Sequence, residues 1–544
     1  MSDNLNKTQT SNQQELADLK PTDSYTPSPR QQKTSPNRFS VPSWLYVFIF
    51  VGLIRAILKF EPKPDYVDLE KKVFQQDGII LNESQQVQLE KDANSGESTA
   101  QALMAYCLYD GKGGFKEDPL QALIYAEKSA KAGNSSGMWV LGLLEQDDAE
   151  KCKWFRKSAE AENTYGMYSL GAMYKSGWGI AKNDFEAVKW YRKSAEAGNP
   201  LGMCSLGIMY ESGWGIAKND VEAVKWYRKS AEAGDKNGMY NLADMFEYGE
   251  GGLKKDEVEA VKWYRKSAEA GNSYAMSNLG NMYENGRGGL ARNDVEAVKW
   301  YRKSAEAGNS YGMIKLGVMY AVGRGGLAKD EVEAVKWYKK SAEAGNSDGM
   351  NRLGIMYKNG LGGLARDDFQ AVKWFRKSAE ARDALGMNNL GMMYYHGQGG
   401  LARNDVEAVK WFRKSASAGD AGGMWNLGRM YSNGYGLARN DVEAVKWFRK
   451  SAEAGNSDGM HSLGCMYEYG EGGLAENHFE AVKWYRKSAE SGNAVGMWHL
   501  GTMYERGYGG LKVNREKAIE WYRKASKLGE ENANISLNVL GLSE

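Results

Sequence analysis

The sequence predicts an all-α protein: an α/α superhelical solenoid of about twelve helix-pair repeats, with a disordered N-terminus and one N-terminal hydrophobic helix. The main observation is a tryptophan followed by Tyr or Phe, which recurs every 36 or 37 residues from Trp154 to Trp521. Periods of this length are typical of solenoids. Seven of the nine prolines lie in the first 64 residues, so the rest of the chain is almost free of helix breakers. The loops GWGIA and GGLA differ by one glycine, which indicates rigid elements on either side.

The front of the chain differs from the rest in composition. Residues 1–40 are rich in Ser, Thr, Asn, Gln and Pro, and we expect them to be disordered. Residues 41–60 are mainly apolar, with an uncharged core at 41–54 that Arg55 interrupts, and as a helix Ser43–Phe60 would be about 27 Å long, close to the ~30 Å hydrocarbon core of a bilayer. We predict a transmembrane or signal-anchor helix, and a cleaved signal peptide and a buried or interfacial helix stay open as alternatives. The residues predicted to anchor it are Trp44, Leu45, Val47, Phe48, Ile49, Phe50, Val51, Leu53 and Ile54.

Residues 61–97 are charged and predict a linker with short helices. A single-pass membrane location follows from these assignments, with the periplasmic or lumenal side slightly favoured over the cytoplasmic side for the repeats. The repeats occupy 98–529, where the pair at 98–133 is divergent and the pair at 134–162 has lost most of its loop. Residues 530–544 predict a C-terminal capping half-repeat.

Each repeat contains two helical patterns. The first, as in 309–323, opens on Asn or Asp, which are preferred N-cap residues. The second, as in 332–345, closes on Gly, and in the preceding repeat Asn293 and Glu296 predict a capping box. On the second helix, charged residues cluster on one face and Ala, Val, Trp and Tyr on the other. Neither helix can bury its apolar face alone, so the repeats are expected to stack.

The repeated letters resemble those of the Sel-one-like repeats, a subclass of tetratricopeptide-like (TPR-like) helical repeats. The matching phrases are LGxMYxxGxGG in the first helix and its loop, and AVKWYRKSAEAG in the second, over about 98–529. The resemblance implies an α/α superhelix that acts as an adaptor for protein complexes, often at membranes, with the first helices lining the concave side. Glu162 and Arg382 replace the terminal glycine, so their turns are expected to differ. Some cysteine-rich relatives are reported to have β-lactamase activity, but this chain lacks their cysteines.

Comparison between the repeats identifies a variable stripe on the first helix. Counted from its first Met (Met313 is position 0), positions 0, 3, 4, 6 and 7 barely change, whereas positions 1, 2, 5, 8 and 9 vary. At about 100° per residue the variable positions form one contiguous arc. Asn, Tyr and Trp suit the binding of an extended peptide, although drift on a solvated face is the alternative. The predicted partner-binding residues are Tyr168, Tyr240, Lys315, Arg352, Asn388, His396, Trp425, His461, Trp498 and His499.

Several kinds of chemistry are not indicated. The 71 basic and 69 acidic residues argue against binding of nucleic acid through bulk charge. Ser135 lies in a G-x-S-x-G phrase, but no strand precedes it and all four histidines lie beyond residue 395. The glycine loops follow helices, which excludes a dinucleotide fingerprint. His461 and His499 fall in neighbouring repeats without an evident third ligand, so we predict no metal and no cofactor.

The sequence therefore predicts a non-enzymatic, membrane-tethered scaffold that binds a partner protein or peptide along the first helices. A regulatory subunit of a membrane or envelope complex would use the same surface. A hydrolase hidden in the fold, like the cysteine-rich relatives, is the alternative of another class. No nucleic acid and no small-molecule substrate is expected.

Overall fold

The computed structural model describes residue 81, residues 83–111 and residues 114–542. The predicted anchor at 41–60 and the tail at 1–40 lie outside these residues. The described chain is all helical, with 26 helices and no strand. Among these helices none is long and apolar enough to cross a bilayer. The chain divides into two compact units that meet between Ala307 and Gly308, and each is described by itself.

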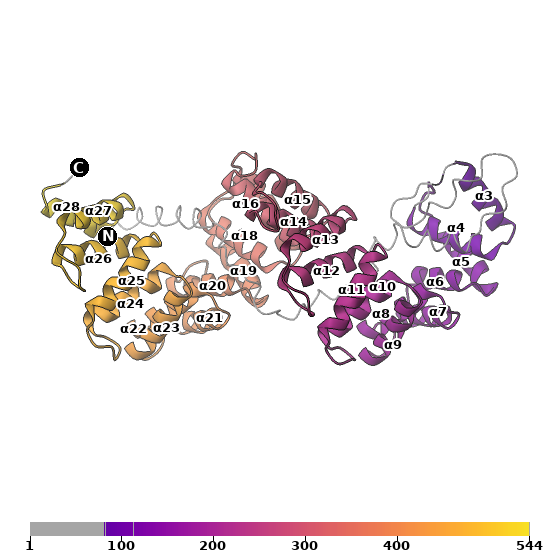
Figure 1. Ribbon diagram of the computed structural model, residues 1–544, viewed down its shortest axis with the longest axis horizontal. Helices are drawn as coiled ribbons and strands as arrows, with labels where there is room; N and C mark the ends of the chain where they lie inside the picture. The colour runs from indigo at the N-terminus through magenta and orange to yellow at the C-terminus, as the bar shows by residue number, and fades with distance from the viewer. Residues whose placement is uncertain (1–80, 82, 112–113, 543–544) are drawn as a thin grey trace. The chain divides into compact units, whose positions relative to one another are not determined.

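The N-terminal unit contains one leading helix and six helix pairs (Figure 1). Its helices are α3 (Glu83–Asn94), α4 (Ser98–Asp110), α5 (Pro119–Lys131), α6 (Ser135–Leu144), α7 (Asp148–Glu160), α8 (Thr164–Ser176), α9 (Asp184–Glu196), α10 (Pro200–Ser212), α11 (Asp220–Glu232), α12 (Lys236–Tyr248), α13 (Glu257–Glu269), α14 (Ser273–Asn285) and α15 (Asp294–Glu306).

The C-terminal unit contains six more pairs and one terminal helix. Its helices are α16 (Ser310–Val322), α17 (Glu331–Glu343), α18 (Ser347–Asn359), α19 (Asp368–Glu380), α20 (Ala384–His396), α21 (Asp405–Ser417), α22 (Ala421–Asn433), α23 (Asp441–Glu453), α24 (Ser457–Tyr469), α25 (His478–Glu490), α26 (Ala494–Arg506), α27 (Arg515–Lys527) and α28 (Glu531–Val539). We call the even-numbered helices α4–α26 the A helices and the odd-numbered helices α5–α27 the B helices.

The constant letters of the repeat pack the two helices of a pair against each other. A β-carbon added to Gly354 of α18 would lie 2.7 Å from the ring of Phe375 on α19, so only glycine admits the aromatic residue here. A second glycine of the same helix, Gly349, approaches the hydroxyl of Ser341 on the preceding B helix. That serine is fully buried and donates to the carbonyl of Ser310 on the previous A helix, 3.0 Å away. The hydrogen bond joins the two helices of one pair, and the close approach of Gly349 to Ser341 joins that pair to the next.

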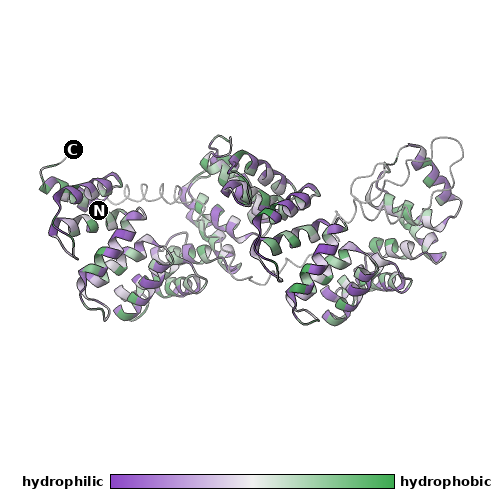
Figure 2. Ribbon diagram, viewed as in Figure 1, coloured by the Kyte–Doolittle hydropathy of each residue, from purple (hydrophilic) through white to green (hydrophobic). Residues whose placement is uncertain are grey.

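The wet and buried faces of the B helices are as predicted, and Figure 2 shows hydrophilic and hydrophobic residues on opposite sides of the same helices. On α17, Ala334, Val335 and Tyr338 are buried, whereas Lys336 and Glu333 form an exposed ion pair. The tryptophan lies at the border of the two faces. In each of the repeats from Trp154 to Trp521 a lysine three residues later covers the indole ring, as Lys340 covers Trp337 at 4.3 Å. The lysine stem and charge shield a ring that the pair buries incompletely.

Of the capping box predicted for Asn293 and Glu296, the structure contains only the half made by Asn293. Asn293 accepts hydrogen bonds from the backbone N–H groups of Val295 and Glu296, as an N-cap does. The reciprocal half of the predicted capping box is absent in this helix, because the N–H of Asn293 donates to the carbonyl of Tyr283 at 2.8 Å. The Glu296 carboxylate is thereby left to pair with Lys299 at 2.5 Å.

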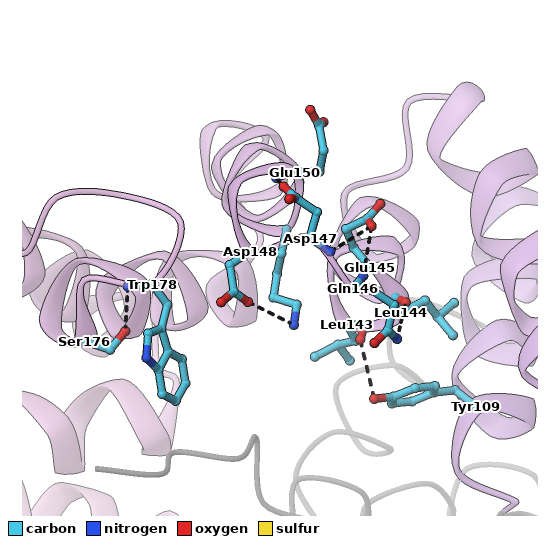
Figure 3. A network of polar contacts seen from close by, with 11 residues as sticks. Tyr109, Leu143, Leu144, Glu145, Gln146, Asp147, Asp148, Glu150, Ser176 and Trp178 are labelled. Atoms are coloured by element: carbon cyan, nitrogen blue, oxygen red, sulfur yellow. Dashed lines mark hydrogen bonds and ion pairs between the residues drawn. The ribbon is translucent and has the colours of Figure 1, made fainter.

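The pair α6/α7 has lost the glycine loop, and acidic side chains organise the linker at 145–147 instead (Figure 3). The Glu145 carboxylate accepts from the N–H groups of Gln146 and Asp147 at 2.8 and 3.2 Å. Asp147 in turn caps α7 by accepting from the N–H of Glu150 at 2.9 Å. The helix pair therefore persists although its loop is gone.

Candidate interaction surface

The variable positions 1 and 2 of the A helices face the neighbouring A helix. Position 1 of one repeat contacts position 2 of the next, and we call this line of contacts the A-helix seam. Asn389 donates to Asn351 at 2.8 Å, and Asn426 donates to Asn388 at 2.9 Å. Asn351 is 3% and Asn426 5% exposed. The variation at these positions is therefore matched between neighbours.

The tryptophans of the A helices obey the same pairing rule. Trp139 donates through Nε1 to the hydroxyl of Ser169 at 3.1 Å, and Trp425 does the same to Ser462 at 3.0 Å. Trp498 donates to Ser536 of α28 at 3.1 Å. Each large ring thus meets a small acceptor on the next helix. Trp425 and Trp498, both predicted to bind a partner, are therefore half-buried against the seam.

The other predicted residues are also engaged within the chain. Tyr168 lies 6.0 Å from the ring of Tyr191, and Tyr240 lies 6.0 Å from the rings of Tyr264 and Tyr274. Lys315 lies over Tyr311 at 5.6 Å. Arg352 pairs with Asp348 at 2.9 Å, with its side chain 20% exposed.

Of the ten predicted residues only His396, at the end of α20, is classed as exposed. Whether these positions bind a partner stays a prediction.

A cluster of aromatic and arginine side chains lies beside the seam on α20 and α22, and we call it the Arg429 cluster. The guanidinium of Arg429 lies 4.7 Å from the ring of Trp425 and 5.9 Å from that of Tyr395. Tyr395 and Tyr435 lie 6.1 Å apart, and Arg403 lies over both rings at 5.3 and 5.9 Å. These are the residue types that dominate binding energy at protein interfaces.

The surface is hollowed at this cluster. The hollow is lined by Met392, Tyr395, Asn426, Arg429, Asn433 and Tyr435, together with the buried Phe412 and Met430. It has no room for an enclosed water molecule, so it is a shallow depression between side chains and not a cavity. Partial burial lowers the pKa of His396 below its ordinary value, and the charges of Lys358, Arg429 and Arg403 lower it further. Basic side chains therefore surround His396 at the end of α20.

The histidines at the C-terminal end of the seam converge. The rings of His461 on α24 and His499 on α26 lie 4.9 Å apart, and Cys465, one turn after His461, lies 3.4 Å from His461 Nε2. Burial lowers the pKa of His461 to about 4 and that of His499 to about 3, and it raises the pKa of Cys465 to about 11. Both imidazoles are thus neutral near pH 7, and the thiol is protonated.

Sequence reasoning missed the residues that complete these two clusters. It recognised positions 5 and 8 as variable but named no candidate there, although Arg429 and Cys465 stand at position 5 and Tyr395 at position 8. The missing signal was the i, i+4 spacing of His461 and Cys465, which places both on one face of a helix. Tyr435 lies in the loop after α22, where the repeat comparison named no candidate.

The comparisons with known proteins follow this architecture. The family model described as Sel1 repeat matches eleven segments: 98–134, 164–199, 200–235, 237–272, 273–309, 310–346, 347–383, 384–420, 421–456, 457–493 and 494–530. The chain belongs to the Sel1 repeat family. The pair α6/α7, which lost its loop, is the pair without a match. Sel1 repeats generally mediate protein–protein interaction, and their solenoid is typically a non-enzymatic scaffold.

Several solved Sel1 repeat structures are similar to this chain. A protective antigen of uropathogenic Escherichia coli, described as displaying an SLR fold, is 31% identical with a TM-score of 0.53, over 84% of this chain and 97% of that one. A Sel1 repeat protein from Oxalobacter formigenes is 32% identical with a TM-score of 0.41, over 48% of this chain and 99% of that one. Helicobacter pylori cysteine rich protein B is 24% identical with a TM-score of 0.20, over 22% of this chain and 92% of that one. A comparison with curated proteins finds no match.

Proposed function

We propose that this Sel1 repeat chain is a non-enzymatic scaffold that holds an extended segment of a partner protein against the Arg429 cluster. The observation that supports the proposal most directly is the position of the Arg429 guanidinium near the rings of Trp425 and Tyr395, at 4.7 and 5.9 Å. A guanidinium held on two rings keeps its N–H groups in a fixed plane, which suits the recognition of a carboxylate.

The experiment is crosslinking and affinity capture from the source cells with the full chain and two variants. Arg429→Glu with Tyr435→Ala changes the cluster but keeps the Trp425–Ser462 contact of the seam. Lys373→Glu, on the exposed face of α19, is the matched control. We expect the cluster variant to lose a partner that the control retains, and the partner's binding to weaken at least tenfold when measured with purified protein. Equal binding to the cluster variant and the wild type would place the interface elsewhere.

The tether is a second part of the proposal. The apolar segment at 41–60 supports it by its length, and we propose that it anchors the scaffold as a single-pass helix, on the periplasmic or lumenal side. Deletion of 41–60 is then expected to release the repeats from the membrane fraction. Protease added to intact cells or spheroplasts would report the side on which the repeats lie. Retention of the deletion variant in washed membranes would contradict the anchor.

The regulatory-subunit interpretation uses the same surface and differs only in the nature of the partner. The hydrolase interpretation finds no support in the geometry. Ser135 lies at the start of α6, its carbonyl accepts from Ser158 at 2.8 Å, and all four histidines belong to the other unit.

A further inference from the structure

Three side chains with metal-binding atoms converge in the C-terminal unit. His461 and Cys465 lie one turn apart on α24, and His499 comes from the adjacent A helix α26. One potential ligand atom from each lies within 4.8 Å of the other two, and the Cys465 Sγ to His461 Nε2 distance is 3.4 Å. Atoms bound to one tetrahedral zinc ion, at about 2.0–2.3 Å from it, lie about 3.3–3.7 Å from one another. Small side-chain rotations therefore bring the three onto one ion.

A surrounding shell holds these side chains in place. The ring of Tyr485 on α25 stacks on His499 at 4.6 Å with an interplanar angle of 15°, and Trp498 contacts the same imidazole edge-on at 4.5 Å. The Tyr485 hydroxyl lies 2.6 Å from the Glu468 carboxylate and 3.2 Å from Cys465 Sγ. Glu468 lies 3.7 Å from His499 Nδ1. A carboxylate beside an imidazole is the usual outer partner of a metal-bound histidine, where it fixes the orientation of the ring.

The other repeats show that this set is a local departure from the pattern. At other junctions of the seam Asn389 pairs with Asn351, Trp425 with Ser462 and Asn241 with Cys204. Position 5, where Cys465 stands, is Ile355 in α18 and Met392 in α20. No packing requirement shared by the repeats therefore accounts for two histidines and a cysteine at one point of the seam. Within the described residues this is also the group that meets the geometric condition for a metal site.

We propose that His461, Cys465 and His499 form a site for one transition-metal ion, with Zn²⁺ as the ion of choice. Two imidazoles and a thiolate are the ligands that zinc prefers, whereas Mg²⁺ and Ca²⁺ prefer oxygen. Binding deprotonates Cys465, and the proton passes to solvent. Three protein ligands occupy three corners of a tetrahedron, and the fourth corner accepts water or a side chain of a bound partner. Because the seam joins α24 to α26, the ion would also fasten the last repeats to each other.

The first test is Co²⁺ titration of the full chain with free thiols reduced, followed by competition with Zn²⁺. We expect one equivalent of Co²⁺ to give a thiolate-to-metal charge-transfer band and visible d–d bands, both abolished by Zn²⁺. Cys465→Ser should remove the charge-transfer band, and His499→Gln should weaken binding at least about tenfold. Cys204→Ser and His396→Gln, a cysteine and a histidine outside the cluster, are the matched controls and should leave the titration unchanged. Absence of the band in the wild type, or its persistence in Cys465→Ser, would refute the site.

A second test separates ligand loss from misfolding. Glu468→Gln keeps all three ligands, so it should retain the stoichiometry while weakening Zn²⁺ binding about 10–100-fold. Zn²⁺ should raise the melting temperature of the wild type and of both controls, since a ligand that binds only the folded state stabilises it. Cys465→Ser with a native circular dichroism spectrum should show no such rise. A rise of equal size in Cys465→Ser would assign the effect to metal bound elsewhere.

Discussion

Two residues take a backbone conformation that favours glycine. Glu162 and Arg382 end their B helices with φ of 62° and 65°, in the left-handed region where the other repeats have glycine, such as Gly345 at 84°. The sequence analysis expected these turns to differ, and that expectation is wrong, because the same hydrogen bond forms: Glu162 N–H donates to Ala159 at 3.1 Å, as Gly345 does to Ala342 at 3.0 Å. The stacking of the repeats imposes the same turn at every repeat, so Glu162 and Arg382 adopt a strained backbone conformation.

Replacing either residue by glycine is therefore expected to stabilise the protein. Relief of the left-handed conformation stabilises the folded state by about 1–2 kcal/mol. The extra conformational freedom of glycine in the unfolded chain offsets about 0.4–1 kcal/mol of this gain. We expect Glu162→Gly and Arg382→Gly each to raise the free energy of unfolding by about 0.5–1 kcal/mol in urea titrations. Gly345→Arg, the reverse change at an equivalent turn, should lower it. A loss of stability in both glycine variants would show that the side chains make compensating contacts.

The alternation of Tyr and Phe after the repeat tryptophan has a residue-scale cause. Tyr264, Tyr485 and Tyr522 point their hydroxyls at a glutamate at position 8 of their own A helix, at 2.6–2.7 Å. The four Phe repeats have Gln146, Lys358, Tyr395 or Ser432 at that position. A buried hydroxyl is stabilised by an acceptor, so glutamate at position 8 occurs only with Tyr, although Tyr191 and Tyr338 occur opposite Lys175 and Ala321.

Removal of such a hydroxyl tests this pairing. Tyr522→Phe deletes a hydrogen bond to the Glu505 carboxylate, and bonds to charged groups contribute about 1.5–3 kcal/mol. We expect a loss of that order in the free energy of unfolding. Tyr191→Phe is the matched control, because position 8 of its A helix is Lys175, and it should change stability by less than about 0.5 kcal/mol. Equal losses in both variants would contradict the pairing rule.

At the scale of the helix, the N-cap of the A helices from α6 to α26 is either Asn or Asp, and burial affects the stability of the two differently. Asn493 accepts from Gly496 N–H and also donates to Asp458 of the preceding A helix at 2.7 Å. Asp383 also caps its helix, but it faces the equivalent Asp348 without an amide to donate. Burial raises the pKa of Asp383 above its ordinary value of 3.8, and the charge of Asp348 raises it further.

The sign of the resulting pH dependence follows from this shift. The folded state holds the Asp383 proton more tightly than the unfolded chain, so the unfolded chain ionises first as the pH rises above about 4. Stability is then lost with rising pH, and the loss persists at pH 7. We expect Asp383→Asn to stabilise the protein by about 1 kcal/mol at pH 7 and by little at pH 3. Urea unfolding at both pH values is the measurement. Asn493→Asp, the reverse substitution, should destabilise at pH 7, and a pH-independent gain in Asp383→Asn would contradict the argument.

The elements and their caps were predictable because each repeat confirms the others. Met, Gly and Trp at fixed spacing define the helix pair, and no distant contact alters it. The seam was not predictable in the same way, because Trp425 and Ser462 lie in different repeats and each looks like drift when read alone. Cys465 was missed for a related reason, because its candidate role as a metal ligand depends on its proximity to His499 on another helix. Periodicity within the repeats can be found in the sequence directly. To predict which residues pair between repeats, one must also know the register between neighbouring A helices.

At the scale of the whole molecule, repeats interact only with their neighbours, so stability is expected to be a sum of repeat and junction contributions. The C-terminal unit offers a test, because the pairs Asn351–Asn389 and Asn388–Asn426 are of the same type. Deletion of 384–420, one repeat of this unit, brings Asn351 opposite Asn426 and restores the junction. Deletion of 421–456 instead brings Asn388 opposite Ser462 and removes the Trp425 donor.

We therefore expect the two deletions to differ although each removes one repeat. The chain without 384–420 should keep the helix content per residue and the urea midpoint of the wild type, with a smaller denaturant slope in proportion to its length. The chain without 421–456 should unfold at a lower urea concentration, since its new junction lacks a hydrogen-bonded pair and a packed ring. Circular dichroism during urea titration measures both. If the two midpoints were equal, the A-helix seam would contribute nothing to cohesion, and its variable residues would then be free to serve a partner alone.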